Sequence, residues 1–283
     1  MRLPPGWYPQ TSGGVSQFLA KIPRNNPADG TALAAAAPHA GWYYSGAIAA
    51  RALLSLKRDA DTVVIIGGHL PGGMPPLLTA EDAVETPLGE MPVDKEFRAA
   101  LERSLSTLFQ GSNGLCSKVQ SDRSADNTVE VQLPLAHYFF PKARLIALRL
   151  PADIRSLEAG KEIARIGREL GRRPVVLGST DLTHYGTNYG YSPKGGGEKA
   201  LAWVRDVNDA NFIAAVKAGN PEAILDRAEA DRSACSAGAV LGALGFAQGA
   251  VLGAELLAYG TSADASPGEI PDSFVGYGAF CWR

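Results

Sequence analysis

The chain has 283 residues, of which 46% are hydrophobic and 20% are charged, and its formal net charge is −2 at pH 7. This composition supports a sizeable core and argues against global disorder, and the small net charge argues against a general nucleic-acid-binding surface. No apolar run approaches the roughly 18–20 residues of a membrane-spanning helix, and the N-terminus lacks an apolar signal segment. We therefore expect a cytoplasmic protein with no nucleic-acid or membrane partner.

Continuous apolar runs are the strongest strand signals. They lie at residues 33–38, 62–68, 144–150 and 174–179. Such runs are typical of strands buried on both faces of a sheet. Between the first two runs, residues 45–60 have helical spacing, with Ser45 as the expected N-cap.

Further helices are expected between and after these strands. The segments are about 94–109, 128–140 and 153–171, followed by mostly helical chain after residue 195 and two late strands at 254–262 and 272–282. Alternating strands and helices predict an α/β fold with a central mixed or mostly parallel sheet, covered by helices on both faces. Residues 1–283 are expected to form a single domain.

Three of the four histidines follow expected strands. His39 and His69 each come directly after one, and His184 lies five residues after another. The carboxyl ends of parallel neighbouring strands share one edge of a sheet, where ligands bind in α/β proteins, so we expect these imidazoles to converge. His137 lies in an expected helix and is interpreted as a packing residue.

Two further residues have chemical context. Asp181, three residues before His184, is placed to orient an imidazole or accept a proton, although a loop-capping role explains it too. Cys235 lies at the start of an apolar helix, where a lowered thiol pKa suits a metal ligand or a nucleophile, although a small buried residue at a helix start explains it equally well. Cys116 and Cys281 lack such context, and an odd number of cysteines makes a poor disulfide framework.

Imidazole nitrogens and a thiol sulfur are donors for iron, copper or zinc. The alternative is a hydrolytic triad of Cys235, His184 and Asp181, which leaves His39 and His69 without a role. The sequence contains neither a standard phosphate-binding glycine loop nor an HExxH pattern.

Motifs in order along nearly the whole chain resemble the MEMO family, protein B of the AmmeMemoRadiSam system, which shares its fold with LigB-type class III extradiol dioxygenases. They are "GWYP" at 6–9, "APHAGWYYSG" at 37–46, "VVIIGGH" at 63–69, "ETPLGEMPVD" at 85–94, "NTVEVQLPL" at 127–135, "GSTDLTHYG" at 178–186, "CSAGA" at 235–239 and "YGTSAD…DSFVGYGAF" at 259–280.

The resemblance implies a LigB-like fold and a metal pocket built from His39, His69 and His184, with Asp181 and Cys235 close by. Family members are described as binding iron or copper, with redox activity in some. It thus implies a metal-dependent, dioxygenase-like oxidoreductase acting on a small substrate, in which His184 is a ligand or proton carrier, Asp181 orients it, and Cys235 completes the metal set. Radical-SAM and AMMECR-type proteins of the same system are the implied partners.

Aromatic residues flank the expected metal ligands. Trp42, Tyr43 and Tyr185, together with Asn127, are expected to line a substrate pocket. The same aromatics would suit a recognition cleft for a short peptide, so a non-catalytic metal- or peptide-binding scaffold is the alternative.

The chain departs from the family pattern in two places. The turn before His69 is one residue shorter than the usual Gly-Pro-x-His, which predicts a different loop there. At the position of a family Glu-His-Ser the chain has Asp126-Asn127-Thr128, and Asn127 with Glu130 three residues later fits a helix cap. Because an amide does not titrate near neutrality, Asn127 cannot replace a histidine in proton transfer.

Overall fold

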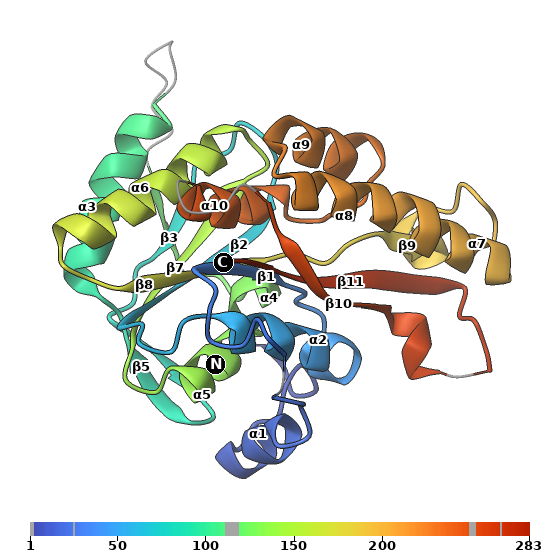
Figure 1. Ribbon diagram of the computed structural model, residues 1–283, viewed down its shortest axis with the longest axis horizontal. Helices are drawn as coiled ribbons and strands as arrows, with labels where there is room; N and C mark the ends of the chain where they lie inside the picture. Colours follow the sequence, from blue (N-terminus) through green and yellow to red (C-terminus); the bar gives the residue numbers. More distant parts are fainter. Residues whose placement is uncertain (1–2, 25, 111–118, 249–252, 267) are drawn as a thin grey trace.

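A single large sheet organises the molecule in the computed structural model, which describes residues 3–24, 26–110, 119–248, 253–266 and 268–283 (Figure 1). The strands are β1 (Ala34–Ala37), β2 (Thr62–Leu70), β3 (Leu77–Thr79), β4 (Ala83–Thr86), β5 (Gly89–Pro92), β6 (Gln120–Asp122), β7 (Arg144–Pro151), β8 (Pro174–Ser179), β9 (His184–Gly186), β10 (Glu255–Thr261) and β11 (Ser273–Trp282). Nine of them form the sheet, in the order β10-β11-β1-β8-β2-β7-β3-β6 with β9 on β11, and β4 and β5 form a separate hairpin.

The centre of this sheet is parallel. Strands β1, β8, β2 and β7 run side by side in the same direction, with Val64 opposite both Val176 and Ile146. Their apolar runs are buried, as a sheet covered on both faces requires. The predicted fold class is confirmed: the carboxyl ends of β1, β8 and β2 lie together along one edge.

Helices cover both faces of the sheet (Figure 1). They are α1 (Ser12–Leu19), α2 (Trp42–Ser55), α3 (Lys95–Leu108), α4 (Asn127–Glu130), α5 (Leu133–Phe139), α6 (Arg155–Glu169), α7 (Gly197–Trp203), α8 (Asp209–Ala218), α9 (Pro221–Ala230) and α10 (Ala237–Ala247), with a π-helical turn at Val204–Asn208. One layer holds α3, α6 and α10, and the opposite layer holds α1, α2 and α5. None of the helices in the described ranges is long and apolar enough to cross a membrane.

Helix α10 is entirely buried and packs unusually closely on its neighbours. A Cβ on Gly238 would lie 2.0 Å from the carbonyl oxygen of Pro151, and one on Gly245 would lie 1.9 Å from that of Leu157. Only glycine permits this approach. The close packing brings the first residues of α10, and the loop before them, to the carboxyl edge of the sheet.

Two helix boundaries differ from the sequence-based prediction. Helix α2 begins at Trp42 with Gly41 as N-cap and ends at Ser55, so Ser45 is not the cap; its hydroxyl donates to the carbonyl of Ala40 from within the first turn. The segment predicted at 128–140 is two helices, α4 and α5, and α5 starts afresh with a proline in its first turn.

Helix α4 is capped differently from the prediction. Its N-cap is Asp126, whose carboxylate accepts from the amide of Thr128, and not Asn127. The Glu130 carboxylate accepts instead from the backbone amide of Leu3 and the hydroxyl of Tyr8. An aspartate one position earlier therefore takes the capping role, and Asn127 is left to face the sheet edge.

Candidate metal centre

His39 lies just beyond the end of β1 and is almost fully buried, at 1% exposure. Its backbone amide donates to Asp181 Oδ1 (2.7 Å), and its Nδ1 lies 3.2 Å from the hydroxyl of Ser179 at the end of β8. Asn127 donates from its side-chain amide to the His39 carbonyl (3.3 Å). Contacts from two neighbouring elements thus fix both the backbone and the ring.

His69 is the second-last residue of strand β2 and has an unusual backbone conformation. Its φ is +58°, the left-handed region that residues other than glycine seldom adopt. Its ring meets that of His39 edge-on, with 5.0 Å between centroids, and its side chain is 38% exposed. The shortened turn predicted from the sequence therefore coincides with a left-handed residue that directs this ring toward His39.

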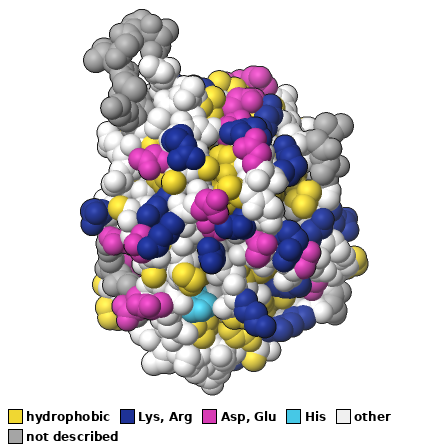
Figure 2. Space-filling model, turned by 90° about the vertical axis from the view of Figure 1, so that its left-hand side faces the viewer, with side chains coloured by type: hydrophobic (Ala, Val, Ile, Leu, Met, Phe, Trp, Pro, Cys, Tyr) yellow, Lys and Arg dark blue, Asp and Glu magenta, His cyan; other side chains and the backbone are white. Residues whose placement is uncertain are grey.

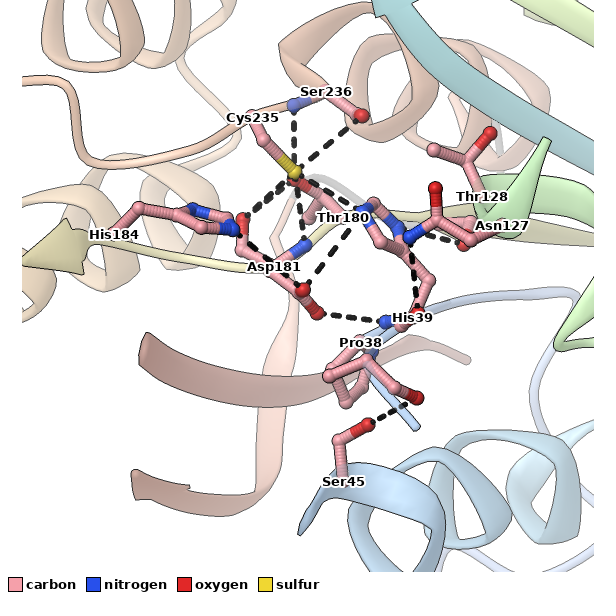
Figure 3. Close-up of polar contacts among 12 residues, drawn as sticks. Pro38, His39, Ser45, Asn127, Thr128, Thr180, Asp181, His184, Cys235 and Ser236 are labelled. Carbon is pink, nitrogen blue, oxygen red and sulfur yellow. Dashed lines mark hydrogen bonds and ion pairs between the residues drawn. The ribbon is translucent and has the colours of Figure 1, made fainter. Parts of the chain in front are cut away.

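Cys235 comes from the loop before α10, and its sulfur lies among the other groups (Figure 3). The sulfur is 3.3 Å from His39 Nε2 and accepts from the backbone amide of Asp181 at 3.3 Å. One donor atom from each of His39, His69 and Cys235 lies within 4.8 Å of the others. These three side chains are therefore close enough together to coordinate one ion.

Asp181 and His184 lie beside this group of three. One carboxylate oxygen of Asp181, Oδ2, is 3.8 Å from His39 Nε2 and 4.0 Å from His184 Nε2, so the carboxylate stands between the two rings (Figure 3). His184 is 30% exposed, and its ring meets that of Tyr189 edge-on at 4.9 Å. His184 is not part of the three-donor group, and Asp181 contacts the buried imidazole as well as this outer one.

His39 and Cys235 shift each other's pKa. Burial lowers the pKa of His39, but the negative charges of Asp181 and Cys235 outweigh burial and raise that pKa to about 9. Burial raises the pKa of the Cys235 thiol, but the charge and hydrogen bond of His39 bring it well below its ordinary value. Both shifts favour the thiolate–imidazolium form of the pair, and the thiolate is the form of a cysteine that binds a metal ion.

The cause of this thiolate corrects the sequence-based explanation. Helix α10 begins at Ala237 with Ser236 as N-cap, so Cys235 precedes the cap and is not inside the helix. The largest effect that lowers its pKa is the His39 imidazole rather than the helix terminus. Burial also raises the pKa of Asp181, against the opposing charge of His39.

The residues predicted to line a substrate pocket separate into core and surface. Trp42 is 2% exposed and donates from its indole nitrogen to the Val131 carbonyl, and Tyr185 is fully buried with its hydroxyl on the Gly195 carbonyl. Both are core residues. Tyr43 is 74% exposed, and Asn127 contacts the backbone of His39. Of the four, Asn127 is the one whose contact with the centre is direct.

His137 and Cys281 lie apart from the centre. His137 is in α5, and its Nδ1 is 2.7 Å from the Thr86 hydroxyl of the β4–β5 hairpin. Cys281 is buried in β11, and burial raises its pKa to about 11. Cys116 lies outside the described residues.

Sequence reasoning missed the hydroxyls that surround the ligands. Ser179 contacts the His39 ring, Ser236 accepts from the His69 amide (3.3 Å), and Thr128 accepts from the Gly68 amide (3.1 Å). Each lies inside or beside a motif quoted above. Nothing in the local sequence distinguishes them, because the partner of Ser236 is 167 residues away along the chain.

Comparison with known proteins identifies the family of the chain. The model of the Memo family, described as "Memo-like protein", matches residues 2–281. The chain belongs to the Memo family. MEMO1 family proteins from Methanococcoides burtonii and Methanopyrus kandleri are 30% and 31% identical to it, over 87% and 93% of this chain and 85% and 87% of theirs.

The resemblance seen in the sequence motifs is thereby confirmed at the level of the family. A solved structure, that of an uncharacterized protein from Escherichia coli K12, aligns with a TM-score of 0.47 and 12% identity, covering 88% of this chain and 98% of that one. It is too distant to bear on the chemistry of this chain.

Proposed function

We propose that this Memo-family chain binds one redox-active transition-metal ion, iron or copper, through His39, His69 and Cys235. The observation that supports the proposal is the approach of three donor atoms within 4.8 Å of one another. Two imidazole nitrogens and a thiolate are the borderline-soft donors that iron, copper and zinc prefer over magnesium and calcium. Zinc suits the same donors and is the competitor that the experiment must separate.

The surroundings of the donors favour occupancy by a cation. The two carboxylates of Asp181 and Asp126 lie near the imidazoles, at 3.8 Å from His39 and 3.9 Å from His69. Carboxylates that contact metal-binding histidines orient the rings and raise their basicity. Three protein donors also leave coordination positions for a substrate.

We infer that the chain is a metal-dependent oxidoreductase acting on a small, oxidisable substrate. The bound ion would supply the redox chemistry. His184 is exposed enough to meet a substrate and lies 4.0 Å from Asp181, so it would move the proton while Asp181 holds its ring. Because His184 stands outside the three-donor group, proton transfer does not require a metal ligand to detach.

Asn127 restricts which oxidation is feasible. Ring opening of a catechol needs a group that takes and returns a proton, and a well-placed histidine typically contributes about 10²–10⁴-fold. Asn127 holds the His39 carbonyl and does not titrate near neutrality. We expect the iron-loaded wild type to cleave catechol and protocatechuate slowly or not at all. Iron-loaded Asn127→His is assayed beside it. Brisk cleavage by the wild type would contradict this expectation.

Elemental analysis of protein purified without oxygen or chelator tests the metal proposal. We expect about one iron or copper per chain, and calorimetric titration of the stripped protein should restore one binding site. Oxygen consumption by the loaded protein then separates an oxidoreductase from a scaffold that merely retains the pocket. Stripped protein that takes up neither metal would refute the proposal.

One observation favours a second candidate, cysteine-dependent hydrolysis. The Cys235 sulfur and His39 Nε2 are 3.3 Å apart, the distance expected of a nucleophile and its base. The base would then be His39 and not the His184 of the predicted triad. A hydrolase would lose activity to a thiol-alkylating reagent and keep it in a chelator, whereas a metalloenzyme would lose it in the chelator.

A further inference from the structure

Ser236 stands at the N-cap of α10 but does not cap the helix. Serine is favoured at this position because its hydroxyl accepts from an amide two or three residues later. No such bond forms here. The hydroxyl is nevertheless buried, with 3% of the residue exposed, so it is committed to other partners.

Those partners are two of the three candidate ligands. The Ser236 Oγ accepts from the backbone amide of His69 (3.3 Å) and lies 3.6 Å from the Cys235 sulfur. A hydroxyl has one proton to give and lone pairs to accept with. The Ser236 oxygen accepts from the His69 amide and lies within contact distance of the Cys235 sulfur, so one hydroxyl links two of the three candidate ligands.

A second hydroxyl fixes the preceding residue. The Thr128 Oγ1 accepts from the Gly68 amide (3.1 Å) and donates to the carboxylate of Asp126. Arg149 in turn holds that carboxylate at 2.7 Å. Thr128 is fully buried, so this chain of bonds is shielded from competing water.

The two hydroxyls therefore hold consecutive amides at the point where the backbone turns left-handed. His69 has a φ of +58°, a strained conformation for a residue with a side chain, which persists only where the surroundings impose it. A Cβ on Gly68 would lie 2.3 Å from the Ser236 oxygen, so only glycine at position 68 lets this hydroxyl approach the His69 amide.

We propose that Ser236 and Thr128 are positioning residues that hold His69 in its left-handed turn and aim its imidazole at the site shared with His39 and Cys235. This inference rests on the proposed metal binding. It assigns a role to Ser236, whose side chain does not cap α10, and to Thr128, which is not a proposed ligand. Neither residue is one of the three proposed donors.

The test compares hydroxyl-deleting with hydroxyl-retaining variants. Ser236→Ala and Thr128→Val should weaken iron or copper binding by about 10–100-fold, as loss of a contact to a ligand typically does. Thr128→Ser keeps the hydroxyl and should bind within about threefold of wild type. Ser55→Ala is the matched control, because it deletes a buried hydroxyl whose partner is Ala52, far from the centre along α2.

Two readouts distinguish positioning from general destabilisation. In metal-free protein, hydrogen exchange of the Gly68 and His69 amides should accelerate in Ser236→Ala and Thr128→Val, with other strand amides unchanged. In copper-loaded protein, the electron paramagnetic resonance spectrum and the thiolate-to-copper absorption should shift in the same two variants and in neither control.

The outcomes separate this inference from the proposed function. Wild type that binds metal, with Ser236→Ala and Thr128→Val binding equally well and with unshifted spectra, overturns the positioning role and leaves metal binding intact. Wild type that binds no metal overturns both. Equal loss of binding in Ser55→Ala overturns the positioning role, because the effect would then be one of fold stability.

Discussion

Asp94 and Asp181 are both buried, yet their surroundings shift the pKa of the carboxyl group in opposite directions. Asp94 lies at the amino end of β7, where its amide donates to the Leu145 carbonyl, and its side chain caps α3 through the Phe97 amide (3.1 Å) and binds Arg172 (2.8 Å). Burial would raise the pKa of Asp94, but these hydrogen bonds hold it below its usual range.

Asp181 lies at the opposite edge, beyond the end of β8. Its nearby cationic partners are imidazoles, at 3.8 and 4.0 Å, and burial raises its pKa. Charges at the amino edge are paired with guanidinium groups and serve stability. Figure 2 shows an end of the molecule where Lys and Arg side chains alternate with Asp and Glu in the same manner. At the carboxyl edge Arg149 binds Asp126 (2.7 Å), but the described partners of Asp181 include imidazoles and no guanidinium group, as expected where a ligand or reaction completes the charge.

Removing a ligand should produce the largest effect at the carboxyl edge. We expect His39→Ala and His69→Ala to weaken metal binding far beyond the roughly 10–100-fold typical of residues that only contact a ligand. His137→Ala is the control, since its ring contacts Thr86 away from the centre. Calorimetry of stripped proteins measures the difference, and unchanged affinity in either ligand variant would mean that the site is misplaced.

The two described thiols extend the comparison to cysteine. Burial raises the pKa of Cys281 to about 11, whereas the charge and hydrogen bond of His39 bring the pKa of Cys235 well below its ordinary value. Cys235 should therefore be alkylated first in metal-free protein, at a rate nearly flat between pH 6 and 8. The rate at Cys281 should rise about tenfold per pH unit over this range.

Mass-spectrometric peptide mapping checks both rates, with bound metal expected to protect Cys235. Cys235→Ser should leave Cys281 alkylation unchanged. If Cys281 or Cys116 reacts first, or if alkylation of Cys235 rises steeply over the same pH range, the thiolate at the centre is not formed.

The strands were predictable because their signal is local. Continuous apolar runs identify β1, β2, β7 and β8, and parallel packing then brings their carboxyl ends together. That step placed His39, His69 and His184 at one edge before their side-chain contacts were known. Short strands such as β3, β6 and β9 were not predicted, because three residues carry too little periodicity.

Side-chain placement at the centre depends on contacts between distant segments. Trp42 lies in the core because α2 starts three residues before the expected Ser45. The aromatic motif alone does not indicate which of its side chains is buried. Cys235 becomes a thiolate through His39, 196 residues away along the chain. The left-handed turn at His69 is imposed by hydroxyls from two other segments. None of these contacts leaves a local pattern.

At the amino edge, Asp94→Asn should lower the free energy of unfolding by about 2 kcal/mol at pH 7. The variant keeps an oxygen for the Phe97 amide but loses the charge that Arg172 binds. Because the folded pKa of Asp94 lies below its ordinary 3.8, the stabilisation is present above that value and disappears as pH falls through the folded pKa. Urea unfolding at pH 7 and at acidic pH checks this, and a constant difference would contradict the assignment.

Asp181→Asn provides the smallest change and the opposite sign. Its amide oxygen can still accept from the His39 backbone amide, while a carboxylate that burial disfavours is removed. We expect the metal-free variant to match the wild type or exceed its unfolding free energy by up to about 1 kcal/mol at neutral pH. Since the folded pKa of Asp181 is raised, the wild type bears no penalty at pH below the ordinary 3.8, and the penalty grows as pH rises through the folded pKa. The unfolding free energy that Asp181→Asn gains over the wild type should therefore grow with pH. In the same chelated buffers, the unfolding free energy that Asp94→Asn loses relative to the wild type should also grow with pH. A clear loss of stability in Asp181→Asn at neutral pH would show that the His39 imidazolium compensates Asp181 as fully as Arg172 compensates Asp94, and the two edges would then not differ in kind.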